Sequence, residues 1–178
     1  MACTVTLGDI SYSCDDLGIG GIVELHIASR TAALAAITTK DDAARTISAV
    51  SGAASDVVNI DFHLKDGFSV FSEVKTVDAA GGFTTVPTIS VELPKMDATK
   101  NSVLDQMSNG PKEMVAFVKT AAGTYHVAGL DHGIYVSSID ANSGTGRTEK
   151  NRFQLTLTGE EDGLSYSITE ALFGTITA

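Results

Sequence analysis

Apolar and polar residues alternate with a period of two along much of this chain, and this pattern predicts strands. The stretch "VVNIDFHLK" (57–65) shows the clearest alternation, with Val58, Ile60, Phe62 and Leu64 on one face. The stretch "EKNRFQLTLTGEEDG" (149–163) shows the same period, with Phe153, Leu155 and Leu157 set against Gln154, Thr156 and Thr158. We expect the apolar faces to pack on a core, while the other faces are compatible with water.

A long hairpin is predicted over residues 68–93. The stretches "FSVFSEVKTV" and "TVPTISVEL" are separated by "DAAGG", whose glycines suit a hairpin loop. Pro87 has no backbone N–H to donate to a ladder, which predicts an edge position or a bulge at that residue. The two strands are expected to form an arm.

Further strands are predicted on both sides of this arm. In "EMVAFVK" (113–119) both alternating sets are apolar, which predicts burial on both faces. The C-terminal stretch "ITEALFGTITA" (168–178) is apolar enough to pack, and we interpret it as a last strand. The remaining predicted strands are "GGIVELHIAS" (20–29), "TYHVAGL" (124–130), "GIYVSSI" (133–139) and "RFQLTLT" (152–158).

One helix is predicted at about 97–109. Asp97 or Thr99 can cap its N-terminus, and Asn109, Gly110 and Pro111 form a stop signal. Its apolar stripe is narrow and consists of Val103, Leu104 and Met107. By contrast, the segment at about 29–56 is rich in Ala, Ser and Thr, and we interpret it as a long connection with one helical turn. Docking onto a neighbouring subunit is one use for a connection of this length.

These elements predict a single domain over residues 1–178. A chain of 178 residues, 43% hydrophobic and 19% charged, is long enough and apolar enough to bury a core. The predicted fold class is mainly β, a β-sandwich or barrel-like domain with a hairpin arm and one short peripheral helix.

Charge and composition narrow the function classes. The net charge of −10 opposes binding of nucleic acid, because phosphates are held by Lys and Arg that displace counterions. No apolar run of membrane-spanning length occurs, and the N-terminus lacks the basic start of a signal peptide, so a cytoplasmic product without a membrane partner is expected. Cys3 and Cys14 are interpreted as free thiols.

No residues stand out as catalytic, cofactor-binding or metal-binding. His26, His63, His126 and His132 are scattered, without a second ligand at metal spacing. Asp131 next to His132 is typical of a tight turn. The glycines of "LGIGG" (17–21) precede a strand, whereas a dinucleotide fingerprint follows one, and "SGTGRTEK" lacks the ending of a phosphate loop. The sequence therefore predicts no cofactor, no metal and no enzyme, and directs attention to assembly.

Residues 133–161 carry a resemblance that bears on assembly. This stretch, "GIYVSSIDANSGTGRTEKNRFQLTLTGEE", resembles the C-terminal part of the tail tube (major tail) proteins of tailed bacteriophages. The shared features are a Gly/Ser/Thr-rich loop, an alternating strand and a Thr-Gly-x-Glu ending. The matching residues are Asn151, Phe153, Thr156, Thr158, Gly159 and Glu161.

The resemblance implies a virion structural protein. It implies homo-oligomeric rings, hexameric in that family, that stack into a tube together with other phage tail proteins. DNA passes through the tube without specific binding, and the tail is assembled in the host cytoplasm. It further suggests that "VVNIDFHLK" or a neighbouring strand lines the lumen, and that the 68–93 arm or the N-terminal segment bridges rings. A phage neck or tail-completion ring protein and a non-catalytic β-sandwich binding module are the alternatives.

The three carboxylates Glu160, Glu161 and Asp162 are expected to form an acidic turn rather than a catalytic or metal-binding cluster.

Overall fold

The computed structural model describes residues 20–60, 69–77, 79, 81–109, 113–144 and 151–178. Within them lie eleven strands and three helices, and the strands form one mixed sheet with the order β2-β3-β11-β8-β7-β9-β10-β6-β5. β1 pairs with β7 and β4 beside this path. The elements are β1 (Ile22–Ser29), α1 (Arg30–Ala36), β2 (Ile37–Asp41), β3 (Thr46–Val50), β4 (Val58–Asn59), β5 (Val70–Val77), β6 (Phe83–Pro94), α2 (Ala98–Ser108), β7 (Met114–Thr120), β8 (Tyr125–Ala128), β9 (Ile134–Asn142), β10 (Arg152–Gly159), β11 (Tyr166–Ser167) and α3 (Glu170–Ile176).

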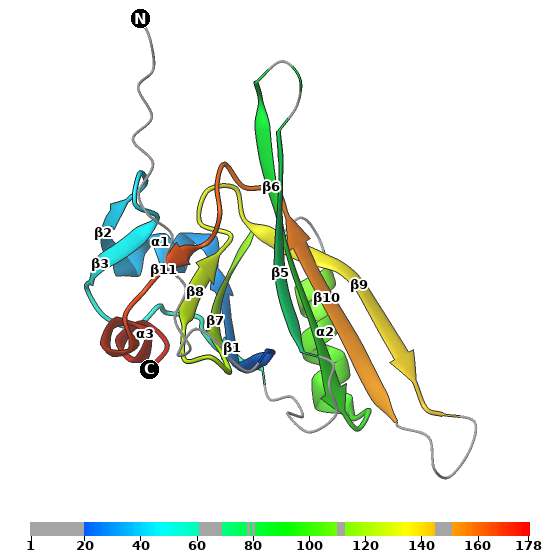
Figure 1. Ribbon diagram of the computed structural model, residues 1–178. Coiled ribbons are helices and arrows are strands. Elements are labelled where there is room, and N and C mark those ends of the chain that lie inside the picture. The colour runs from blue at the N-terminus through cyan, green and yellow to red at the C-terminus, as the bar shows by residue number, and fades with distance from the viewer. Residues whose placement is uncertain (1–19, 61–68, 78, 80, 110–112, 145–150) are drawn as a thin grey trace, which may run out of the picture.

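The sheet has two parts, which are joined where β7 meets β9. The only pair between these strands is Met114 with Ile134, so the sheet can bend there. We call β9, β10, β6 and β5 the arm sheet, and β1, β7, β8, β11, β3 and β2 the body sheet. Figure 1 shows the arm sheet on the right and the body sheet on the left. The prediction of a mainly β domain is confirmed.

A first hydrophobic core lies between the two parts. The arm sheet supplies Ile89, Val91, Leu93, Phe153, Leu155 and Leu157, all at most 4% exposed. The body sheet supplies Leu25, Ala116 and Val118, and α2 supplies Leu104. The apolar sets of residues 152–158 therefore face inward, as their alternation predicts.

A second core lies on the other side of the body sheet. Val115 and Phe117 of β7 point into it, together with Phe173 and Ile176 of α3 and three alanines of α1. β7 is consequently buried on both faces, as its two apolar sets predict.

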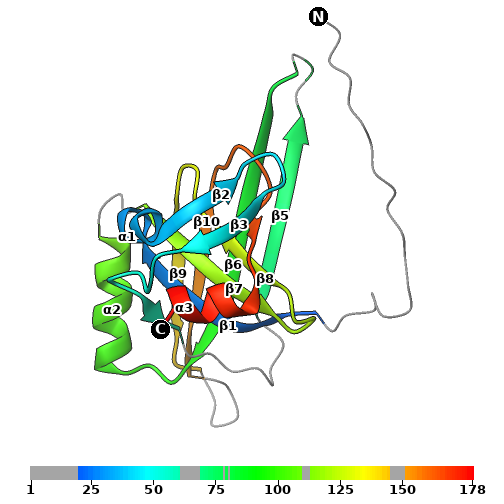
Figure 2. The same cartoon turned by 90° about the vertical axis from the view of Figure 1, so that its left-hand side faces the viewer.

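The hairpin arm is confirmed. β5 and β6 are antiparallel, and they pair from Val70 with Ser90 to Val77 with Phe83. Figures 1 and 2 show that the upper half of this hairpin projects beyond the rest of the fold.

Of the two alternatives predicted for Pro87, an edge position or a bulge, the edge position is wrong, because β6 lies between β5 and β10. The ladder from β6 to β10 ends at the pair Thr88–Thr158 and resumes only at the bridge Thr85–Glu161. Pro87 lies in this interruption, where its missing N–H costs the sheet little.

The prediction of a connection over residues 29–56 is also wrong. Ser29 accepts a hydrogen bond from the N–H of Ala32 and so caps α1, and β2 and β3 then form a hairpin. The alanines are small, which lets α1 approach the body sheet closely. Arg45 adopts a positive φ of 51° just before β3, while Asp41 accepts hydrogen bonds from the N–H groups of Ala43 and Ala44.

Two further predictions are corrected. The stretch 168–178 contains α3 (Glu170–Ile176) rather than a strand, because Phe173 and Ile176, three residues apart, both reach the second core. Of the strand predicted at 57–65, the structure describes residues 57–60, of which Val58 and Asn59 form β4, and 61–65 lie outside the described residues. Val58 is 39% exposed, whereas Ile60 is buried.

The predicted helix is confirmed as α2. The carboxylate of Asp97 accepts the N–H of Lys100, and Asn109 ends the helix.

Candidate assembly surface

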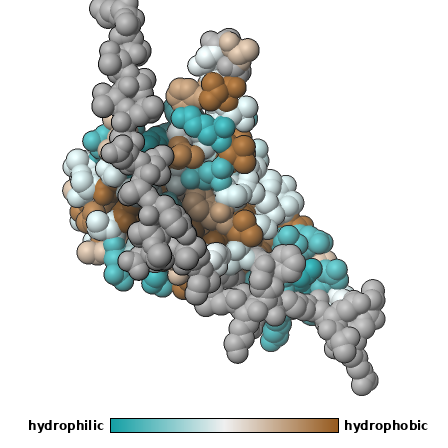
Figure 3. All heavy atoms as spheres, viewed as in Figure 1, coloured by the Kyte–Doolittle hydropathy of each residue, from teal (hydrophilic) through white to brown (hydrophobic). Residues whose placement is uncertain are grey.

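The outer face of the arm sheet is polar and mostly uncharged along its two central strands, β6 and β10. Its central strands expose hydroxyl and amide side chains that lie opposite one another, because Thr158 pairs with Thr88 and Thr156 pairs with Ser90 and Ser138. Gln154 continues the row between Glu92 and Asp140. Figure 3 shows a band of pale, weakly polar residues on the right-hand side of the molecule, where the arm sheet lies. The inner face is sealed by the first core, so one sheet separates an apolar interior from a hydrophilic surface.

The charges on this face are balanced in part by an ion pair. The guanidinium of Arg152 lies 2.5 Å from the carboxylate of Glu92, which is 8% exposed. Arg152 is thereby held by a neighbouring carboxylate on the sheet. Asp140, on β9, is exposed.

Both edges of the arm sheet are open in the described part of the chain. β5 pairs with β6 alone, and β9 beyond Ile134 pairs with β10 alone. The edges also expose apolar side chains: Val70 is 50% and Val74 62% exposed on β5, and Tyr135 is 51% exposed on β9. An open edge with apolar side chains is suited to pairing with another strand.

Glu161 does not belong to a solvent-exposed acidic turn, which corrects the expectation for residues 160–162. Its side chain is 5% exposed, and its carboxylate accepts the N–H groups of Asp131, His132 and Gly133 at 2.9, 3.0 and 3.1 Å. Its backbone exchanges two hydrogen bonds with Thr85. Glu161 thus ties the turn before β9 to the arm, whereas Glu160 and Asp162 are exposed.

A pair of glycines makes this anchor possible. A Cβ on Gly159 would lie 2.5 Å from the carbonyl oxygen of Gly133, so no side chain fits between β10 and the start of β9. Gly133 itself has a φ of 90°. A Gly-x-Glu ending to a strand is the sequence signal for this contact, although alternation alone does not reveal it.

Asp131 lies in an ion-pair network that connects the turn before β9 to the β2–β3 hairpin. Arg45 bonds its carboxylate at 2.8 Å and stacks on the ring of Tyr166, and Lys40 lies 3.7 Å away. Burial alone would raise the pKa of Asp131, but the hydrogen bonds from Arg45 and Tyr166 and the charge of Arg45 bring it below its ordinary value. Burial and hydrogen bonds to Asp42 and Asp131 raise the pKa of Tyr166, so its hydroxyl keeps its proton. The network is structural.

The histidines do not converge, and His63 lies outside the described residues. His26 packs edge-on against Phe173. His132 lies 3.0 Å from Asp162, whose hydrogen bond and charge raise the pKa of His132. His126 lies at the base of the arm, and its burial lowers its pKa.

A serine, a histidine and a carboxylate do meet beside His126. Ser165 Oγ lies 3.3 Å from His126 Nδ1 and donates to Glu73 Oε2 at 2.9 Å. In a nucleophilic triad the carboxylate orients the histidine and the histidine accepts the serine proton. Here the carboxylate holds the serine directly, through its hydroxyl and its backbone N–H, so the arrangement does not activate Ser165.

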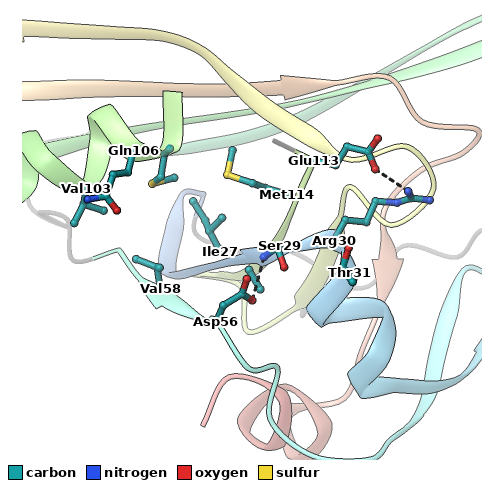
Figure 4. Close-up of a pocket in the computed structure, with 12 residues that line it drawn as sticks. Ile27, Ser29, Arg30, Thr31, Asp56, Val58, Val103, Gln106, Glu113 and Met114 are labelled. Carbon is teal, nitrogen blue, oxygen red and sulfur yellow. Dashed lines mark hydrogen bonds and ion pairs between the residues drawn. The ribbon is translucent and has the colours of Figure 1, made fainter. Parts of the chain in front are cut away.

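A groove of about 660 Å³ lies between α2 and the strands β1 and β4. Figure 4 shows its apolar side, which includes Ile27, Val58 and Met114, and its polar rim, where Arg30 and Glu113 form an ion pair of 2.8 Å. Asp56 lies at the same rim and accepts the N–H of Ser29 at 3.2 Å. The periodicity of the sequence did not indicate this groove, because its lining comes from four separate segments.

In the part of the chain that the structure describes, no three His, Cys, Asp or Glu side chains gather to hold a metal ion. None of the helices found there is long and apolar enough to cross a membrane. Cys3 and Cys14 lie outside the described residues. Comparison of the chain with models of protein families, with curated proteins and with solved structures found no match.

Proposed function

We propose that this chain is a virion structural protein that forms rings, six copies to a ring, which stack into a phage tail tube. One observation carries the proposal. The two central strands of the arm sheet present a hydrophilic, mostly uncharged outer face between two open strand edges, and the other face of these strands is sealed by the core. A sheet with a hydrophilic face and two open edges is suited to form one part of a closed barrel with a water-filled interior.

Ring closure would use the two edges. The β5 edge of one copy pairs with the β9 edge of the next, and each copy adds four strands to a continuous inner barrel. Closure removes the open edges and places the outer-face side chains of Val74 and Tyr135, which are more than half exposed in the single chain, beside the side chains of the next copy. The gain in covered apolar area favours the ring over the monomer.

The lining would let DNA slide. Thr, Ser and Gln side chains offer neutral hydrogen-bonding groups, and the cation that lies among them, Arg152, is paired with Glu92. Proteins bind DNA phosphates when Lys and Arg displace counterions, so a lining without unpaired cations would bind DNA only weakly. The net charge of −10 also disfavours binding of DNA phosphates to the protein. In this proposal β10 and its neighbours line the lumen, and β4, which pairs with β1, does not.

Electron microscopy of the purified full-length chain at high concentration tests the proposal. We expect six-fold rings and stacked tubes. Val74→Lys should prevent ring closure, because a charge on an edge strand opposes pairing with another strand. Leu34→Lys is the matched control, since Leu34 is an exposed apolar residue on α1, outside the arm sheet.

The outcomes separate the candidate functions. Monomers that persist with and without other tail proteins would refute a tail tube, and saturable binding of a glycan or protein by such a monomer would support a binding module. Single rings that never stack would favour a neck or tail-completion ring protein.

A further inference from the structure

The tip of the arm carries an apolar patch that its own chain leaves exposed. Val77 and Phe83 are a cross-strand pair, and they are 66% and 52% exposed. Figure 3 shows hydrophobic side chains gathered on the upper arm. Lys75 lies on the same face, with its Nζ 4.4 Å from the centre of the Phe83 ring. The patch therefore combines two large apolar side chains with one cation.

The groove beside α2 has complementary chemistry. Its apolar side includes Val58, Val103 and Met107. The groove is open to solvent, as the 39% exposure of Val58 shows. Its rim carries two carboxylates, Asp56 and Glu113, but only one cation, Arg30, which is paired with Glu113. Among the lining residues the rim has one negative charge in excess.

We propose that the arm tip of one copy inserts into the groove beside α2 of a second copy. Val77 and Phe83 enter the apolar part, and Lys75 meets the acidic rim at Asp56. The contact is heterologous, because the tip and the groove are different surfaces of the same chain, so it can propagate from copy to copy. This contact rests on the proposed function in one respect, which is that copies of the chain associate with one another. Within that function, the contact would make the arm the element that joins one ring to the next.

Charge favours this occupant over a second arm tip. Two tips packed against each other would bring two Lys75 side chains together, and like charges at a contact disfavour it. At the groove the same lysine meets a carboxylate. The apolar patch and the groove would both be covered by one contact, and neither would remain exposed in the assembly.

Site-specific photo-crosslinking tests the contact. Phe83 is replaced by p-benzoylphenylalanine in the full-length chain, which is mixed with a natural chain labelled with ¹⁵N and irradiated. Benzophenone reacts readily with methionine, and Met107 and Met114 line the groove. We expect hybrid peptides that join an unlabelled arm to a labelled α2 or β7 segment. Crosslinks only between arms, only within one chain, or to neither segment would overturn the proposal.

Substitutions at the two partners provide a second measurement. Phe83→Asp and Val58→Asp should each weaken association of the chain at least tenfold in sedimentation velocity, and Leu34→Asp should not. Lys75→Glu should weaken it as well, and Asp56→Lys in the same chain should restore it. Circular dichroism confirms that each variant is folded. Equal association of Phe83→Asp and the natural chain would contradict the contact.

These results also distinguish failure of this contact from failure of the proposed function. Rings that stack normally with Phe83→Asp would overturn the arm–groove contact and leave the tail tube proposal standing. Hybrid crosslinks in the groove without any ring would support the contact and refute the tube.

Discussion

Glu161 allows the sharpest test of how the arm is attached to the rest of the fold. We expect Glu161→Ala to lower the free energy of unfolding strongly, because its carboxylate accepts three backbone N–H groups. An unsatisfied buried donor costs about 1–3 kcal/mol. The N–H of Gly133 is buried, whereas the other two lie where water can replace part of the loss. The total should therefore be about 4 kcal/mol, above the common range for single substitutions.

The assay is thermal and urea unfolding followed by far-ultraviolet circular dichroism, at a concentration low enough to keep the chain monomeric. For a domain of this size, 1 kcal/mol corresponds to about 2–4 °C in Tm, so a decrease of about 8–16 °C is expected. Glu160→Ala is the matched control, since Glu160 is the exposed neighbouring carboxylate, and it should change stability by less than about 0.5 kcal/mol.

Glu161→Gln separates the charge from the shape of the side chain. The amide oxygen can still accept N–H groups, but the amide nitrogen cannot, so we expect an intermediate loss of about 2 kcal/mol. If Glu161→Ala is no more destabilising than Glu160→Ala, the anchor is not energetically important and the reasoning fails.

Three further predictions concern local stability. Gly159→Ala should lower the free energy of unfolding in urea by about 2–3 kcal/mol, because the added Cβ would lie 2.5 Å from the carbonyl oxygen of Gly133. Gly174→Ala in α3 is the control, since its Cβ would meet no atom within 4 Å and the substitution should be neutral or stabilising. Asp97→Ala should remove the cap of α2 at a cost of about 1 kcal/mol, and Asp97→Asn should retain most of it. The pKa of Asp131 is lowered in the folded state, so its contribution to stability is complete well above its ordinary pKa of 3.8 and is lost as the pH falls through the folded value. Asp131→Asn should flatten the dependence of unfolding free energy on pH below about 5, and an unchanged slope would contradict the network.

Local pattern determined most of the elements of this protein. The alternation at residues 152–158 and the double apolar sets at 114–118 predicted which faces are buried, because a strand has a period of two whatever it packs against. Asp97 and Asn109 predicted the limits of α2, because caps act within one helical turn. The glycines between Val77 and Phe83 predicted the arm, because a tight hairpin needs residues that tolerate positive φ.

The tertiary structure decided what these local signals could not. Residues 29–56 have few large apolar side chains, and the alanines of α1 are buried because they pack in the second core with Val115 and Phe117 of β7. The C-terminal segment is a helix because Phe173 and Ile176 find the second core there.

The surfaces that carry both proposals also depend on residues distant in sequence. The groove beside α2 combines residues from four segments, and the polar centre of the arm sheet's outer face depends on the register of β9, β10 and β6. Periodicity shows which side chains share a strand face, but only long-range packing determines which faces and edges remain uncovered.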